Sequence, residues 1–241
     1  MKLLVFDIDG TLTATNRVDG ESFSSAVRAV LPISADLNWS QFTEFTAAAI
    51  LRELWATYST EEYSTVEADV QRHLFAHLES RVASDPEAFV PIGGAQDIFA
   101  KVRHAGWTPA IATGGWRRSA EFKLATAGIA TRGVPFATSS EHDRRTDIIR
   151  SAVRLAAEGA EPQKIVYVGD GAWDVRASRE LGIGFVGRAG PYRAQRLLDL
   201  GASAVVPDFT DADALIALLS GSRSLVPSAD AGSAPLPPES R

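Results

Sequence analysis

Residues 1–16 read MKLLVFDIDGTLTATN, and an apolar run at residues 3–6 ends directly in Asp7 and Asp9. A run that is apolar at every position is typical of a strand in a parallel sheet that helices cover on both faces. Two carboxylates so close together repel each other, so a metal ion, a shared proton or solvent has to offset their charge. The stretch therefore predicts a buried strand that leads into a polar site.

The rest of the chain repeats the pattern of a short apolar run followed by a helical stretch. Further strands are predicted at residues 108–113, 164–168, 184–187 and 202–206. Helical spacing of apolar residues covers 95–104, 117–127, 146–157, 173–181, 192–200 and 211–219. Strands that alternate with helices predict an α/β fold, with a Rossmann-like three-layer core built on a parallel sheet.

One long segment interrupts this alternation. Helical patterns at 40–58 and 60–83 follow one another with no strand between them. We therefore predict a small all-helical cap domain at residues 21–90, inserted into an α/β core formed by residues 1–20 and 91–220. Residues 221–241 are rich in Ser, Pro, Ala and Gly, which predicts a disordered tail.

Composition narrows the class of protein. The formal net charge of −6 argues against a nucleic-acid or membrane-surface binder, and no apolar run is long enough to cross a membrane. The chain has no cysteine, which excludes a disulfide, a thiol nucleophile and a zinc site with cysteine ligands. No signal peptide is recognisable at the start, so we expect a cytoplasmic protein.

Carboxylates follow two of the predicted strands. Asp7 and Asp9 follow the first, and Asp170 and Asp174 follow the run at 164–168. Ligands of an open parallel sheet bind beyond the carboxyl ends of its strands, so we expect these four side chains near one edge. Magnesium suits such a group, because it takes oxygen ligands and usually works beside phosphate.

A second pattern at the same edge suits phosphate. Thr113, Gly114 and Gly115 lie between a predicted strand and the start of a helix. A hydroxyl and the backbone N–H groups of glycines at a helix N-terminus form a cradle for an anion. Carboxylates, a metal ion and such a cradle together predict phosphoryl transfer.

The order of these motifs resembles the haloacid dehalogenase (HAD) superfamily. The resemblance rests on DIDGT at 7–11, Thr113 after an apolar strand, and GDGAWD at 169–174, and covers roughly residues 1–210. The helical insert resembles the cap that follows the first motif in phosphoglycolate phosphatase-like members. The family also has a basic residue before its last motif, for which Arg145 is the best match and Arg144 and Lys123 are alternatives.

The resemblance implies a role for each matching residue. Asp7 would be the nucleophile that forms an aspartyl-phosphate, and Asp9 would transfer protons to the leaving alcohol and from the attacking water. Thr113 and Gly114 would bind the phosphoryl group, and Arg145 would balance its charge.

The resemblance also implies a magnesium site. The ion would be held by the Asp7 carboxylate, the backbone carbonyl of Asp9 and the side chain of Asp170. Asp174 would lie near the ion or contact the residues that hold it.

We therefore predict a magnesium-dependent phosphatase that acts on a small phosphorylated metabolite, as a monomer or homodimer. Two alternatives stay open: a phosphomutase of the β-phosphoglucomutase type, and a phospho-ligand binding protein without turnover. Family members that dehalogenate carbon lack a second aspartate, whereas Asp9 is present here. Residues 21–90 contain no lysine, so the Schiff-base chemistry of phosphonate-cleaving members is excluded.

Overall fold

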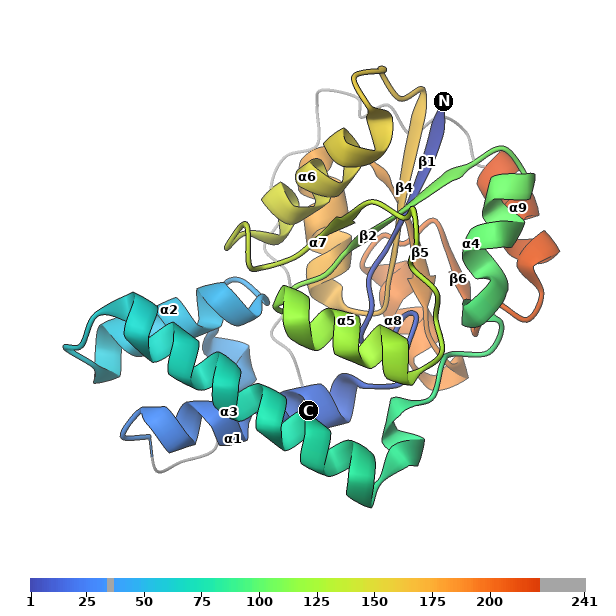
Figure 1. The fold of residues 1–241 in the computed structure, drawn as a ribbon. Coiled ribbons are helices and arrows are strands. Elements are labelled where there is room, and N and C mark those ends of the chain that lie inside the picture. The colour runs from blue at the N-terminus through green and yellow to red at the C-terminus, as the bar shows by residue number, and fades with distance from the viewer. Residues whose placement is uncertain (34–36, 222–241) are drawn as a thin grey trace.

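A parallel sheet forms the centre of the computed structural model, which describes residues 1–33 and 37–221 (Figure 1). Within these residues the sheet has six strands in the order β3-β2-β1-β4-β5-β6. The strands are β1 (Lys2–Phe6), β2 (Thr108–Ala112), β3 (Phe136–Ala137), β4 (Lys164–Gly169), β5 (Gly184–Arg188) and β6 (Ala204–Val206). Apart from Gly221, the predicted disordered tail lies outside the described residues.

The order of the strands reverses at β1. Phe6 pairs with Ile111 of β2 on one side and with Val168 of β4 on the other. The chain runs outward from β1 to β2 and β3, then returns to β4 and continues outward on the opposite side. The carboxyl ends of β1 and β4 are therefore neighbours at the switch in strand order, where α/β proteins bind ligands.

Helices cover both faces of the sheet. One face packs against α4 (Ala95–His104), α5 (Arg117–Thr126) and α9 (Ala212–Gly221), and the other against α6 (Arg145–Ala157), α7 (Ala172–Leu181) and α8 (Pro191–Asp199). In β1, Leu4 and Phe6 belong to the first layer of packing and Leu3 and Val5 to the second, as the alternation of side chains along a strand requires. The prediction of a three-layer α/β core is confirmed.

The segment between β1 and α4 is helical but differs in detail from the prediction. It contains α1 (Asn16–Val30), a 3-10 turn η1 (Trp39–Gln41), α2 (Ala47–Tyr58), α3 (Tyr63–Ser84) and a second 3-10 turn η2 (Pro86–Phe89). The single helix predicted over 40–58 was wrong: α2 begins only after Thr46, whose hydroxyl accepts a hydrogen bond from Ala49 N at 3.2 Å. Helix α1 was not predicted, because Gly20 and several serines obscure its apolar spacing.

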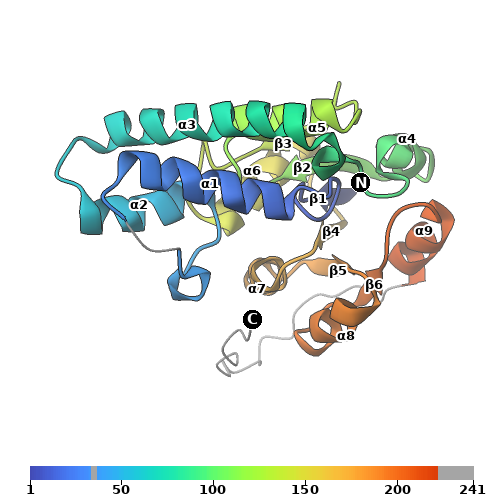
Figure 2. The same cartoon turned by 90° about the horizontal axis from the view of Figure 1, so that it is seen from below.

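These helices pack against the edge of the core. Trp116 lies within their apolar cluster, and Phe122 of α5 packs against it. The rings of Phe75 and Phe122 are 5.1 Å apart, and Trp116 Nε1 donates to Glu67 Oε1 at 3.1 Å. Figure 2 shows α3 running beside both α1 and α5. The division into a core and a separate cap domain stays a prediction, since the two parts share this cluster.

None of the helices in the two described ranges has the length and the apolar character needed to cross a membrane.

Candidate active site

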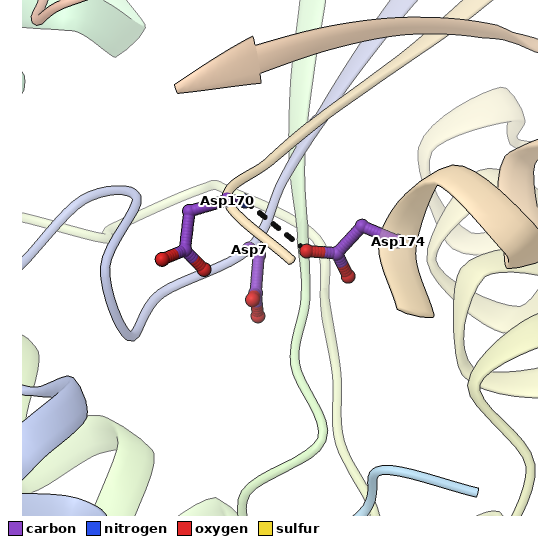
Figure 3. A group of neighbouring side chains, drawn as sticks. All are labelled: Asp7, Asp170 and Asp174. Atoms are coloured by element: carbon purple, nitrogen blue, oxygen red, sulfur yellow. Dashed lines mark hydrogen bonds between the residues drawn. The ribbon is translucent and has the colours of Figure 1, made fainter. Parts of the chain in front are cut away.

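Three buried carboxylates meet at the switch in strand order. Asp7 follows β1, Asp170 follows β4, and Asp174 lies in the first turn of α7 (Figure 3). One oxygen from each lies within 4.8 Å of the others. These are three of the four aspartates predicted at the magnesium site. The side chain of the fourth, Asp9, is not part of this group.

Asp174 has both oxygens engaged by the protein. Its Oδ2 accepts hydrogen bonds from the backbone N–H groups of Asp170 (3.1 Å) and Gly171 (3.0 Å). Its Oδ1 accepts from Arg145 Nη1 at 2.9 Å. The carboxylate therefore holds the loop after β4 at the N-terminus of α7, where the helix dipole favours a negative charge.

Asp7 and Asp170 each keep an oxygen without a partner. Asp7 Oδ1 and Asp170 Oδ1 are buried and have no hydrogen-bond partner among the described residues. Burial raises the pKa of Asp7 well above its usual value, and burial together with the charge of Asp174 raises the pKa of Asp170 to about 6. A buried oxygen without a partner is unfavourable, and a hard cation would satisfy both oxygens. The donor set therefore fits magnesium.

The other oxygen of Asp170 is held by residues that the sequence did not single out. Asp170 Oδ2 accepts a hydrogen bond from Asn16 Nδ2 at 3.0 Å and lies 3.3 Å from Arg193 Nη2. Gly10 beside it has φ +74°, and a Cβ there would lie 2.3 Å from Asp170 Oδ2. The turn after β1 therefore requires glycine both for its backbone conformation and for the close approach of Asp170.

Arg145, at the start of α6, provides the buried positive charge of the site. Its Nη1 lies 2.9 Å from Asp174 Oδ1, 3.6 Å from Asp7 Oδ2 and 3.2 Å from Tyr167 Oη. Its Nη2 donates to the Phe45 carbonyl at 2.8 Å, which links the site to the helical segment. The Nε of Arg145 is buried and has no hydrogen-bond partner among the described residues.

The two other candidates for the basic position lie elsewhere. Arg144 is exposed and pairs with Glu180 Oε1 at 2.9 Å and with Glu44 Oε1 at 3.5 Å. Lys123 is fully buried, and its Nζ lies 2.6 Å from Asp9 Oδ2 and 2.5 Å from Asp19 Oδ1. Among the three, Arg145 is thus the residue paired with Asp7, whereas Lys123 is paired with Asp9.

The turn after β2 brings backbone close to Arg145. The hydroxyl of Thr113 is buried and accepts a hydrogen bond from Gly115 N at 3.4 Å. The Gly114 carbonyl accepts from Ala47 N at 2.7 Å, and a Cβ on Gly114 would lie 2.5 Å from Arg145 Nη2. A side chain at position 114 would therefore displace the guanidinium or the helical segment.

A cavity of about 860 Å³ lies between this edge of the sheet and the helical segment. Its walls include five of the predicted site residues: Asp7, Asp9, Thr113, Gly114 and Arg145. The opposite wall comes from α1, the segment around Trp39 and Phe45, and α3. Phe45 stacks on Trp173 of α7, with ring centres 4.6 Å apart and an angle of 11° between the rings.

Several residues that touch the site were not predicted: Asn16, Asp19, Phe45, Tyr167, Trp173 and Arg193. Phe45 and Arg193 come from parts of the chain far from the motifs, whereas Tyr167 and Trp173 lie on either side of Asp170 in the sequence. Trp173 alone lay inside a recognised motif, at 169–174, so that its neighbours in sequence could have drawn attention to it.

Comparison with known proteins agrees with this geometry. The family model for haloacid dehalogenase-like hydrolases matches residues 1–182. No curated protein sequence matches the chain closely enough to count as a relative.

Solved structures of similar fold include a hydrolase from Pseudomonas syringae, with a TM-score of 0.68 and 20% identity over 88% of this chain and 95% of that one. A β-phosphoglucomutase from Clostridium difficile has a TM-score of 0.66 at 14% identity, over 91% and 97% of the two chains. A protein described as a predicted phosphoglycolate phosphatase from Haemophilus somnus has a TM-score of 0.60 at 17% identity, over 89% and 97%. The fold, the motifs and the match to the family model lead to one conclusion: this chain belongs to the haloacid dehalogenase-like hydrolase family.

Proposed function

We propose that the protein is a magnesium-dependent phosphatase that hydrolyses a small phosphorylated metabolite through an aspartyl-phosphate on Asp7. The observation that carries the proposal is the environment of the Asp7 carboxylate. This carboxylate is buried at the cavity, 3.6 Å from Arg145, and one of its oxygens has no hydrogen-bond partner in the part of the chain that the structure describes. A carboxylate in this position can attack a phosphorus atom while Arg145 offsets the charge of the phosphate.

In the first step, an oxygen of Asp7 forms a bond to phosphorus and the bond to the ester oxygen breaks. Asp9 gives its proton to that oxygen, which leaves as an alcohol. In the second step, Asp9 takes a proton from water, the water oxygen bonds to phosphorus, and Asp7 is released. A magnesium ion held by Asp7, Asp170 and the Asp9 backbone carbonyl would supply positive charge beside the phosphoryl oxygens.

Other groups of the chain can hold the phosphoryl oxygens. Thr113 offers a hydroxyl, and the N–H group of Gly114 lies in the same turn on the cavity wall. The Nε of Arg145, which has no hydrogen-bond partner among the described residues, is a further donor. Donors aimed at the charge that develops in the transition state contribute most to the rate in this kind of reaction.

The helical wall of the cavity would select the organic part of the substrate. A volume of about 860 Å³ is within the range of ligand pockets and leaves room for more than the phosphate alone. The wall combines aromatic side chains such as Trp39 with polar ones such as Ser24 and Arg28. This combination suits a small metabolite with both apolar and hydrogen-bonding groups.

A phosphomutase is the second candidate, and the contacts between the helical segment and the site favour it. Ala47 N donates to the Gly114 carbonyl, and Arg145 donates to the Phe45 carbonyl, so this segment lies directly over the site. Restricted access of water would allow the phosphoryl group to return to a sugar. Isomerisation of a hexose phosphate without release of phosphate would support the mutase over the phosphatase.

The deciding experiment is phosphate release from a panel of sugar phosphates, phosphoglycolate, nucleotides and amino-acid phosphates, with magnesium and with a chelator. We expect release with magnesium from wild type and none from Asp7→Asn. Asp97→Asn, which changes an exposed aspartate of α4, serves as the matched control and should keep full activity. Full activity of Asp7→Asn would contradict the nucleophile assignment.

If no member of the panel turns over but one binds tightly, the protein is a phospho-ligand binding protein without turnover. The cytoplasmic location and the monomeric or homodimeric state stay predictions from the sequence.

A further inference from the structure

Lys123 is a buried lysine that the proposed mechanism does not use. Its side chain is 0% exposed, and its ammonium is shared by Asp9 Oδ2 at 2.6 Å and Asp19 Oδ1 at 2.5 Å. Lys123 is therefore a fixed positive charge in direct contact with Asp9.

A buried ion pair is weak evidence for a stabilising role, even with partners as close as Asp9 and Asp19. Removing an ammonium from water costs several kcal/mol, and a buried ion pair is often no more stabilising than apolar residues of similar volume. Stability is thus a weak explanation for a lysine at this position.

The Asp9 carboxylate is held from two sides. Thr15 Oγ1 donates to Asp9 Oδ1 at 2.5 Å, while Lys123 donates to Asp9 Oδ2. Two different donors, one on each oxygen, restrict the rotation of the side chain. Asp9 also lines the cavity, so the restricted carboxylate is one that a substrate can reach.

The ammonium itself lies behind the proposed phosphate cradle. A Cβ built on Gly115 would be 3.7 Å from Lys123 Nζ and 3.9 Å from Thr113 Oγ1. Asp19, its second partner, lies in the first turn of α1, the helix that forms part of the cavity wall. Lys123 on α5 therefore connects Asp9 to the helix that forms part of the cavity wall, and its ammonium lies near the turn that holds Gly115.

We propose that Lys123, anchored by Asp19, is a positioning residue that aims the Asp9 carboxyl group at the ester oxygen of the substrate. The inference rests on the proposed function and adds to it the residue pair on which proton transfer depends. Asp9 gives its proton to the ester oxygen as the phosphorus–oxygen bond breaks, and Lys123 keeps its own proton throughout. Without Lys123, Asp9 would lose the donor that holds its Oδ2 and, with it, the orientation that makes the transfer efficient.

The test exploits the dependence of acid catalysis on the leaving group. A poor leaving group such as an alkoxide needs a proton, whereas 2,4-dinitrophenolate leaves without one. The value of kcat/KM is measured with magnesium for alkyl, phenyl, 4-nitrophenyl and 2,4-dinitrophenyl phosphate, using wild type, Lys123→Met and Asp19→Asn. Lys101→Met, an exposed lysine on α4, is the matched control.

For Lys123→Met we expect kcat/KM to fall about 100-fold or more on alkyl and phenyl phosphate, the range that general acid catalysis contributes. On 2,4-dinitrophenyl phosphate the same variant should lose only a few-fold. Asp19→Asn should show the same trend with a smaller loss, and Lys101→Met should match wild type. An equal loss on all four esters would mean that Lys123 only supports the fold, and would overturn the proposal.

Two variants keep the test decisive if Lys123→Met folds poorly. Asp19→Asn leaves Lys123 paired with Asp9, and the double variant Lys123→Met with Asp19→Asn leaves no unpaired carboxylate at position 19. A loss independent of the leaving group in both folded variants would also overturn the proposal. If wild type releases phosphate from an ester or from a member of the metabolite panel but the trend is absent, only this inference fails; if wild type hydrolyses none of the esters and no member of the panel, the proposed function fails and this inference with it.

Discussion

Arg145 and Lys123 are two buried cations with different side-chain chemistry. Arg145 lies beside Asp7, and Lys123 lies beside Asp9. Arg145 uses its planar fork to contact Asp7, Asp174, the Tyr167 hydroxyl and the Phe45 carbonyl. Lys123 places one compact charge between Asp9 and Asp19. An arginine can join several acceptors in a fixed geometry, whereas a lysine acts as a point charge.

The comparison explains how two aspartates so close in sequence can take different roles. Asp7 has one oxygen without a hydrogen-bond partner among the described residues and faces Asp170, which fits its proposed roles as metal ligand and nucleophile. Both oxygens of Asp9 are hydrogen-bonded to side chains, which suits a group that exchanges protons from a fixed position. The surroundings of each carboxylate, and not its residue type, distinguish the two proposed roles.

The largest effect is expected from replacing Arg145, which contacts both Asp7 and Asp174. In Arg145→Met, Asp7 and Asp174 lose their buried partner, so activity should fall about 1,000-fold and the free energy of unfolding should drop by about 3–5 kcal/mol. Turnover and urea denaturation measure the two quantities. Activity within ten-fold of wild type would contradict the role of Arg145 at the phosphate.

The next largest effect is expected at the proposed magnesium site, close to Arg145. Asp170→Asn removes a charge from the proposed magnesium site, so the magnesium concentration for half-maximal activity should rise at least about 30-fold. Titration of activity with magnesium, and calorimetry of magnesium binding, measure the change. Asp213→Asn on the exposed side of α9 is the control, and an unchanged magnesium requirement in Asp170→Asn would remove Asp170 from the metal site.

A smaller effect should follow from loosening the contact between Arg145 and the helical segment. Phe45→Ala keeps the backbone carbonyl that Arg145 contacts but removes the ring stacked on Trp173. The aromatic pair should contribute about 1 kcal/mol, obtained as the coupling energy between Phe45→Ala and Trp173→Ala in unfolding experiments. A coupling energy near zero would mean that the stack does not hold the segment in place.

The smallest effect is expected at the neighbour of Arg145. Arg144 is exposed and its ion pairs with Glu44 and Glu180 are screened by solvent. Arg144→Ala should therefore change the free energy of unfolding by less than about 1 kcal/mol and leave kcat unchanged. A large loss of activity would reopen the choice between the two arginines.

Local sequence patterns predicted most of the core. The strands expected at 3–6, 108–113 and 164–168 match β1, β2 and β4 within about a residue, because fully buried strands are apolar at every position. The two-residue strand β3 was not predicted, since a pair of residues carries no periodicity. Helix α1 was missed because Gly20 and its serines lower its helical propensity, although Val18, Phe23 and Val27 bury one of its faces.

The sequence by itself determined the α/β class, the family motifs and the three aspartates that meet at the edge of the sheet, because all of these depend on residue type and short spacing. Only the tertiary structure decided that Arg145 faces Asp7 while Lys123 faces Asp9. It also brought Asp19, Phe45 and Trp173 to the site. These pairings join residues tens to more than a hundred positions apart, and which charges meet depends on how α5, α6 and the inserted helices pack rather than on any local pattern.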